Sequence, residues 1–273
     1  MDPCHLYGGV PYLDAHKKIA VIDTAALCHN YKLLKSGVRS AELICVVKAD
    51  AYSHSANTCV PALISSGCRF FAVSCIEEAI AVRNICRKTG AAADILILGY
   101  TYPSQVGLLA QNDIIQTAVS LDHAKALSRC AKEEGCTVRI HLAIDTGMNR
   151  IGISADTDER CRLAIGEIES AISLDNLKTE GIFTHFSKSD EEPVAAFAED
   201  SQTHIQARRF IYIKNELESK GIKLFCHACN SAAAVRFPEY ALDGVRAGIM
   251  LYGIYPSDNF ADIGLLPVMS LST

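Results

Sequence analysis

The sequence predicts an α/β barrel of eight parallel strands enclosed by helices, and three observations support this fold class. Short apolar runs alternate with longer stretches of helical periodicity, and strand–helix repeats of this kind build parallel sheets. Eight such repeats follow an opening strand at 19–23, which is the number and size of a (β/α)8 TIM-type barrel. No Gly-x-Gly-x-x-Gly or Walker sequence follows the first strand, as a nucleotide-binding doubly wound sheet would have.

The barrel strands are expected where apolar and β-branched residues run together. Their expected ranges are 42–47, 70–74, 94–98, 114–119, 137–144, 178–184, 223–228 and 242–246. The intervening helices are typified by 121–134, which Ser120 or Asp122 can cap and Gly135 can end.

Composition argues against several classes of partner. The net charge of −5 leaves no basic excess for nucleic acid, and no apolar run reaches the length of a membrane span. The N-terminus has no basic region followed by an apolar core, so it is not a secretory signal. The 12 cysteines are scattered, many of them in apolar patterns typical of reduced, buried thiols, and a cytoplasmic location is expected.

The only tight cysteine cluster is Cys226-His227-Ala228-Cys229. It falls on an expected strand, where successive side chains point to opposite faces. A zinc site would need further ligands at suitable spacing. We therefore expect buried thiols here and no metal.

Barrel sites form at the C-terminal ends of the strands, so the residues there define the candidate site. These residues are Lys48, Tyr52, Arg150, His185, Asn230, Ser231, Arg246, Gly248 and Ile249. The lysine closes the buried run 43–47, and an amine beside an apolar wall can form a Schiff base with an aldehyde. The alternative is an ordinary strand-end lysine that reaches water.

The remaining strand-end residues suit an anionic aromatic ligand. Ser231 and the backbone near Gly248 and Ile249 follow the last two strands, where barrels usually hold phosphate. Tyr52 can donate its hydroxyl to the same group, and His185 can stack on a ring.

Arg150 and Arg246 are fixed positive donors for a carboxylate or for ring atoms. There are three structural alternatives. Arg246 can pair with Asp243, His185 can be a structural histidine with its hydrogen bonds made within the core, and residues 145–147 can serve only to form a turn.

Five segments, in this order, resemble the alanine racemase family. They are 46–52 (VVKADAY), 145–152 (DTGMNRIG), 181–186 (GIFTHF), 230–232 (NSA) and 245–253 (VRAGIMLYG). The resemblance implies a barrel that binds pyridoxal 5'-phosphate. It also implies an isomerase that interconverts L- and D-alanine in the cytoplasm and supplies D-alanine for peptidoglycan precursors.

The resemblance also implies residue roles. Lys48 is the Schiff-base lysine and one of two bases that exchange the substrate proton. Tyr52, Ser231, Gly248 and Ile249 hold phosphate. The list of expected catalytic residues is Lys48, Arg150 and His185. Arg246 donates to the pyridine nitrogen, Arg150 binds the phenolic oxygen and assists the substrate carboxylate, and His185 packs against the ring.

Three departures from the family pattern stand out. In the family, a tyrosine from a C-terminal β-domain of the other subunit is the second base. We therefore expect an N-terminal segment with one strand (1–23), the barrel (24–256), and a linker with the first strand of a missing β-domain (257–273). A homodimer is expected for the full-length protein and low activity for this chain alone.

The other two departures lie close to the site. Ala143 stands where the family usually has a lysine, which is often carbamylated and then carries a negative charge. The anion that would orient Arg150 must therefore be absent or supplied otherwise. Ser53 and Ser55 stand where the family usually has glycines, and serine is less permissive at positive φ.

Three alternatives remain open from the sequence. Serine racemases of the same family share these motifs, so the amino-acid substrate can be alanine or serine. A non-catalytic pyridoxal-phosphate-binding barrel is a second class, and a misfolding-prone fragment that binds nothing tightly is a third.

Overall fold

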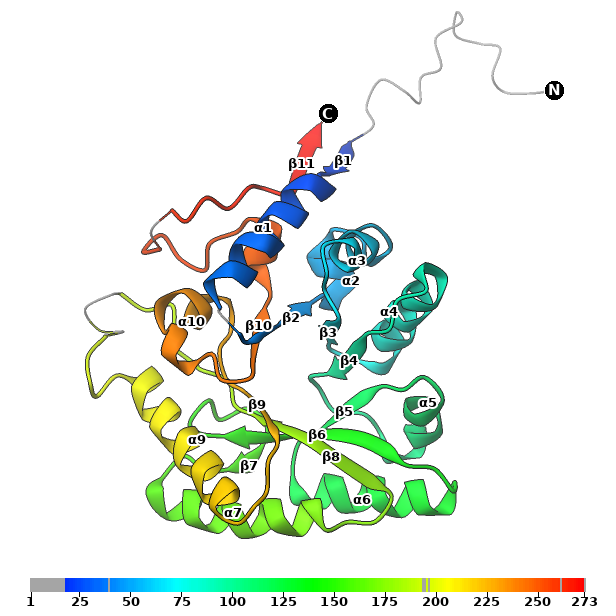
Figure 1. Cartoon of the computed structure of the whole chain (residues 1–273), viewed down its shortest axis with the longest axis vertical. Helices are drawn as coiled ribbons and strands as arrows, with labels where there is room; N and C mark the ends of the chain where they lie inside the picture. The colour runs from blue at the N-terminus through cyan, green and yellow to red at the C-terminus, as the bar shows by residue number, and fades with distance from the viewer. Residues whose placement is uncertain (1–17, 39, 193–194, 196, 261, 273) are drawn as a thin grey trace, which may run out of the picture.

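A computed structural model describes residues 18–38, 40–192, 195, 197–260 and 262–272. Eight parallel strands pair side by side and close on themselves through β5 and β6, so the expected barrel is confirmed (Figure 1). In chain order these strands are β2 (Glu42–Val46), β3 (Phe70–Val73), β4 (Asp94–Ile97), β5 (Ile115–Ala118), β6 (Val138–Asp145), β8 (Leu177–Phe183), β9 (Phe225–His227) and β10 (Gly244–Ala247).

Helices cover the outside of the barrel (Figure 1). They are α1 (Thr24–Gly37), α3 (Ala56–Ser65), α4 (Ile76–Thr89), α5 (Val106–Gln111), α6 (Leu121–Glu133), α7 (Asp158–Ile172), α9 (Gln202–Ser219) and α10 (Ser231–Arg236). Helical turns over α2 (Lys48–Ser53), η2 (Pro103–Gln105), η3 (Pro238–Tyr240) and η4 (Ile249–Tyr252) lie in the connections. Of the helices in the described part of the chain, none combines the length and the apolar character that a membrane span needs.

Helix α6 illustrates how local sequence sets the boundaries. The Ser120 hydroxyl accepts a hydrogen bond from His123 N (3.1 Å), so it caps the helix as expected. Gly135 has φ +62°, a left-handed conformation that ends the helix at little steric cost. The helix therefore begins and ends within one residue of the predicted 121–134.

Alternation along the barrel strands separates two apolar regions. In β2, Leu43 and Cys45 face the large cluster under the helices, whereas Ile44 and Val46 face the barrel interior with Phe70. The N-terminal end of the barrel is closed by a network of charges, in which Arg139 bonds Asp94 (2.8 Å), Asp113 (3.0 Å) and Glu180 (2.9 Å). The residues that the sequence predicts for the site follow the strands at the opposite end of the barrel.

Two elements lie outside the eight-strand pattern. Strand β7 (Ile153–Ser154) pairs with the end of β6 and was not predicted. Strands β1 (Ile19–Ile22) and β11 (Met269–Ser272) form an antiparallel ribbon that projects beside α1 (Figure 1). Strands were expected in both places, and their assignment to a second domain stays a prediction.

Asn30 fastens helix α1 to the segment that follows the last barrel strand. Its side chain is fully buried, donates to Leu251 O (3.0 Å) and Leu266 O (2.8 Å), and accepts from Leu266 N (2.8 Å). We expect Asn30→Ala to lower the free energy of unfolding by about 2–4 kcal/mol, because three backbone groups lose the partner that the buried Asn30 side chain provides. The exposed Asn84→Ala is the control and should change it by less than about 0.5 kcal/mol. Equal urea midpoints for the two variants would contradict this role.

Candidate active site

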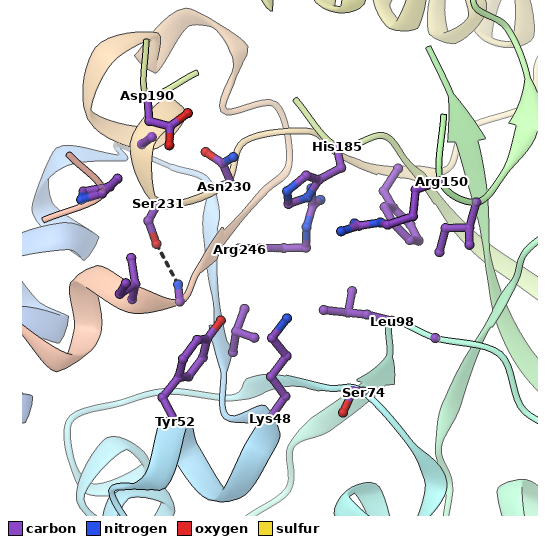
Figure 2. A pocket seen from close by; sticks show the side chains of 18 residues that line it. Lys48, Tyr52, Ser74, Leu98, Arg150, His185, Asp190, Asn230, Ser231 and Arg246 are labelled. Carbon is purple, nitrogen blue, oxygen red and sulfur yellow. Dashed lines mark hydrogen bonds between the residues drawn. The ribbon is translucent and has the colours of Figure 1, made fainter. Parts of the chain in front are cut away.

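A cavity of ≈590 Å³ opens at the C-terminal ends of the barrel strands. Every site residue predicted from the sequence lines it: Lys48, Tyr52, Arg150, His185, Asn230, Ser231, Arg246, Gly248 and Ile249. Figure 2 shows the labelled side chains of Lys48, Tyr52, Arg150, His185, Asn230, Ser231 and Arg246 around one space. Ser74, Leu98 and Gly99 also line it and were not predicted from the sequence. They follow β3 and β4, so the same strand-end rule could have found them.

Lys48 reaches the cavity from the start of an unusual turn. Ala49, Asp50, Ala51 and Tyr52 all have φ between 50° and 56° and ψ between 45° and 53°, which is a left-handed helical turn. Each non-glycine residue in that conformation costs roughly 1–2 kcal/mol. Ser53 and Ser55 also have positive φ (66° and 67°), so the strain expected at these serines is present. The Lys48 amine lies 5.9 Å from the centre of the Tyr52 ring.

Tyr52, Ser231 and Gly248 form a cradle on one side of the cavity. Gly248 N donates to Ser231 Oγ (2.8 Å), as drawn in Figure 2. A Cβ on Gly248 would lie 2.8 Å from the Tyr52 hydroxyl and 3.8 Å from Ser231 Oγ. The space that a Cβ of Gly248 would fill therefore lies beside two hydroxyl groups. Tyr252 packs against the outer face of Tyr52 (5.2 Å between ring centres) and holds that wall in place.

Asn230 holds the helix that begins with Ser231 of this cradle. Its Oδ1 accepts from Ala233 N (2.9 Å) and from Ser189 Oγ (2.9 Å), and its Nδ2 donates to Phe186 O (3.3 Å). It therefore caps α10 and ties it to the end of β8, which fixes Ser231 as the first residue of that helix.

Arg246 is a buried cation whose partners are neutral. Its NH1 donates to His227 Nδ1 (2.6 Å) and His227 O (3.1 Å), and its NH2 donates to Thr184 O (2.7 Å) and Ala228 O (2.9 Å). The expected alternative of a pair with Asp243 is wrong, because Asp243 Oδ2 accepts from Cys226 N (2.8 Å) instead. Burial lowers the pKa of Arg246 to about 10, so it stays charged at neutral pH.

A chain of hydrogen bonds runs from Arg246 through His227 to His141. His227 Nδ1 accepts from Arg246, so its Nε2 carries the proton and donates to His141 Nδ1 (3.0 Å). Burial lowers the pKa of His141 to about 4, and burial followed by the charge of Arg246 lowers the pKa of His227 well below 6.5. Both rings are therefore neutral at physiological pH. Among the described residues no group of three or more His, Cys, Asp or Glu side chains is placed to hold a metal ion.

His185 and Arg150 complete the upper wall (Figure 2). Burial, then the charges of Arg246, Arg150 and Lys48, lowers the pKa of His185 to about 3. Arg150 leaves a turn in which Asp145 accepts from the backbone N–H groups of Gly147, Asn149 and Arg150 (3.0, 3.0 and 3.1 Å). Residues 145–147 thus form a turn, as the structural alternative expected, and the same turn directs Arg150 toward the cavity. Beside Arg150 a second, very small hollow is lined by Ala143.

Fold and site together define a (β/α)8 barrel whose chemistry lies at its C-terminal mouth. Residues 22–256 match the family model for the N-terminal domain of alanine racemase. The chain is similar to alanine racemase of Clostridium tetani (38% identity over 257 residues, 93% of this chain and 62% of that protein). It is also similar to alanine racemase 1 of Clostridium acetobutylicum (39%, 93% and 63%). It resembles the solved alanine racemase of Clostridium difficile 630 with TM-score 0.82 and 33% identity, over 94% of this chain and 64% of that one.

The chain belongs to the alanine racemase family, and the match covers the N-terminal barrel domain of that family. It spans less than two thirds of the length of these relatives.

The three buried, neutral histidines predict how the stability of the protein depends on pH. An unfolded histidine titrates near 6.5, so the unfolded chain binds more protons than the native protein as the pH falls below that value. We expect the free energy of unfolding to fall from pH 6.5 toward pH 4, and the ring signals of His141, His185 and His227 to stay constant between pH 8 and pH 5 in NMR spectra. In His185→Asn the free energy of unfolding should depend less steeply on pH, by up to about one proton in the difference in proton binding between the unfolded and native states. A midpoint near 6.5 for any of the three rings would contradict their burial as neutral groups.

Proposed function

We propose that this chain is the barrel domain of a pyridoxal 5'-phosphate-dependent racemase that interconverts L- and D-alanine. The observation that carries the proposal is the set of cations at the cavity. Lys48, Arg150 and Arg246 converge on it from three different strands, and a glycine cradle lies on its other side. Such a cavity is suited to an aromatic anion that carries a phosphate and an aldehyde.

The residues present fit the cofactor. Gly248 leaves a space that a Cβ would fill, next to the hydroxyl groups of Tyr52 and Ser231, and this is where a phosphate would be held. Arg246 uses NH1 and NH2 on carbonyls and imidazole, and within the described residues its Nε–H has no hydrogen-bond acceptor. That N–H is free to donate to a ring nitrogen.

When bound, pyridoxal phosphate supplies the electron sink that weakens the Cα–H bond of an amino acid. Lys48 would hold the cofactor through its amine, and the same amine would be the general base on one face of the substrate. Arg246 would donate a hydrogen bond to the ring nitrogen without transferring its proton, so that nitrogen would remain unprotonated. Arg150 would orient the phenolic oxygen and the substrate carboxylate by charge-assisted hydrogen bonds.

Racemisation also needs a base on the opposite face. Tyr52 belongs to the phosphate cradle, and the Tyr252 hydroxyl donates to Val46 O (3.1 Å) behind it. We propose that the second base comes from a C-terminal domain of a partner subunit, as the family resemblance implies. The exposed apolar Ile19, Val21 and Leu271 of the β1–β11 ribbon suit contact with that C-terminal domain or with a partner subunit.

Two other features support the finer parts of the proposal. The similar proteins are named alanine racemases, which favours alanine over serine as the substrate. The described cysteines are all free thiols, several of them fully buried, and this supports a cytoplasmic location.

The assignment of Lys48 predicts where the cofactor becomes attached. Incubation with pyridoxal phosphate followed by borohydride should leave one pyridoxyl group on Lys48, detected by mass spectrometry of peptides. Lys48→Arg should remove the label, because a guanidinium does not attack an aldehyde at neutral pH. A label on Lys125 or Lys188 in its place would contradict the assignment.

The cradle predicts the effect of one methyl group. Gly248→Ala should weaken pyridoxal phosphate binding by about 10- to 100-fold in a fluorescence titration, because the added carbon lies where the phosphate would be. Gly166→Ala is the matched control, since no atom lies within 4 Å of a Cβ there. Unchanged affinity in Gly248→Ala would place the phosphate elsewhere.

Solvent exchange distinguishes a racemase from a non-catalytic carrier. With pyridoxal phosphate and D- or L-alanine in deuterium oxide, we expect deuterium at Cα of at least one enantiomer, since Lys48 alone can exchange the proton on its face. Conversion between enantiomers should be slower by roughly 10²–10⁴ if the second base lies outside these residues. Bound cofactor without any exchange at Cα, for alanine or serine, would favour the carrier.

A further inference from the structure

The left-handed turn that follows Lys48 is held by a residue from another part of the chain. Glu78 lies in the first turn of α4, and its Oε1 accepts a hydrogen bond from Ala49 N (2.7 Å). Its Oε2 accepts from Ser74 N and from Ser74 Oγ (2.8 Å each). One carboxylate therefore joins the first residue of the turn to the end of the neighbouring strand β3.

The two oxygens of Glu78 have different tasks. The bonds of Oε2 to Ser74 stay within the loop before α4 and resemble ordinary capping of a helix start. The bond of Oε1 to Ala49 crosses to a different element and meets the turn at its first left-handed residue, directly after Lys48. Helix capping alone does not require this second contact.

The turn needs such an external partner because its conformation is unfavourable for its residues. None of the residues 49–53 is glycine, yet all have positive φ. Within the segment, Ala51 N donates to Val47 O (3.0 Å), and Ala56 N donates to Asp50 Oδ1 (2.7 Å) near its end. Glu78 supplies the corresponding anchor at the beginning.

We propose that Glu78 is a positioning residue that holds the turn 49–53 and thereby directs both Lys48 and Tyr52 into the cavity. Lys48 precedes the turn and Tyr52 is its fourth residue, so one backbone conformation sets the amine and the phosphate-side hydroxyl together. Figure 2 shows both side chains rising from this turn, with Ser74 on the adjoining strand end. The inference rests on the proposed function only in that these two side chains serve the cofactor.

Glu78→Asp tests the inference, with Glu77→Asp as its matched control. Both variants keep the negative charge in the first turn of α4, but an aspartate at 78 is one methylene too short to reach Ala49 and Ser74 together. In the cofactor-free protein, we expect the amides of Ala49, Ala51 and His54 to exchange hydrogen about tenfold faster in E78D than in E77D, with the amides of α4 unchanged. The affinity of E78D for pyridoxal phosphate should fall by a similar factor. The pyridoxyl group that borohydride leaves on this variant should still be found on Lys48.

A rescue experiment separates this role from a general loss of stability. Glycine adopts positive φ freely, so adding Ala49→Gly to E78D should restore part of the lost cofactor affinity. Glu78→Gln, which keeps the length but turns one acceptor into a donor facing an N–H group, is the second variant and should show the same faster exchange.

The outcomes are distinguishable from failure of the proposed function. Equal exchange at 49–54 in E78D, E78Q and E77D would overturn the inference, as would an affinity loss in E78D without faster exchange. If the unmodified protein binds no pyridoxal phosphate, the proposed function fails, and the exchange comparison still decides whether Glu78 holds the turn.

Discussion

A cation inside an apolar barrel must be solvated by the protein itself, and Arg246 meets this requirement without a carboxylate. Main-chain carbonyls at the ends of β8 and β9 and the neutral imidazoles of His227 and His185 accept its terminal N–H groups. A nearby carboxylate would have neutralised the charge, whereas carbonyls leave it available to a ligand. The neutral pair His227–His141 is needed for the same reason, because a second charge at this depth would repel the guanidinium.

The rest of the site depends on that fixed charge. Arg246 sets one end of the ligand position, the cradle of Gly248 and Ser231 sets another, and Lys48 must point between them. The left-handed turn achieves this direction at a cost in backbone energy, which Glu78 and Asp50 offset by accepting hydrogen bonds from the main chain. The charge network of Arg139 at the opposite end of the barrel holds the strands that carry these residues.

Much of this architecture could be predicted from the sequence. Most barrel strands contain a short apolar run, and the strand-end rule places Lys48, Arg150 and Arg246 at one mouth without any knowledge of distances. Strand β7 could not be predicted, since two residues carry no periodic pattern. The solvation of Arg246 and the contact between Glu78 and Ala49 depend on how separate loops meet, which no local pattern records. Local pairing of Arg246 with Asp243 was the simpler hypothesis, and the backbone of Cys226 takes that carboxylate instead.

The ¹⁵N NMR signal of ring-labelled pyridoxal phosphate bound to the protein tests the role of Arg246 most directly. The ring nitrogen should show the shift of an unprotonated pyridine that accepts a hydrogen bond, unchanged from pH 8 to pH 6, because Arg246 stays charged across this range. In Arg246→Gln the signal should move with pH. A protonated pyridinium signal in the unmodified protein would contradict the account, because it would require an anionic partner where the structure has a guanidinium.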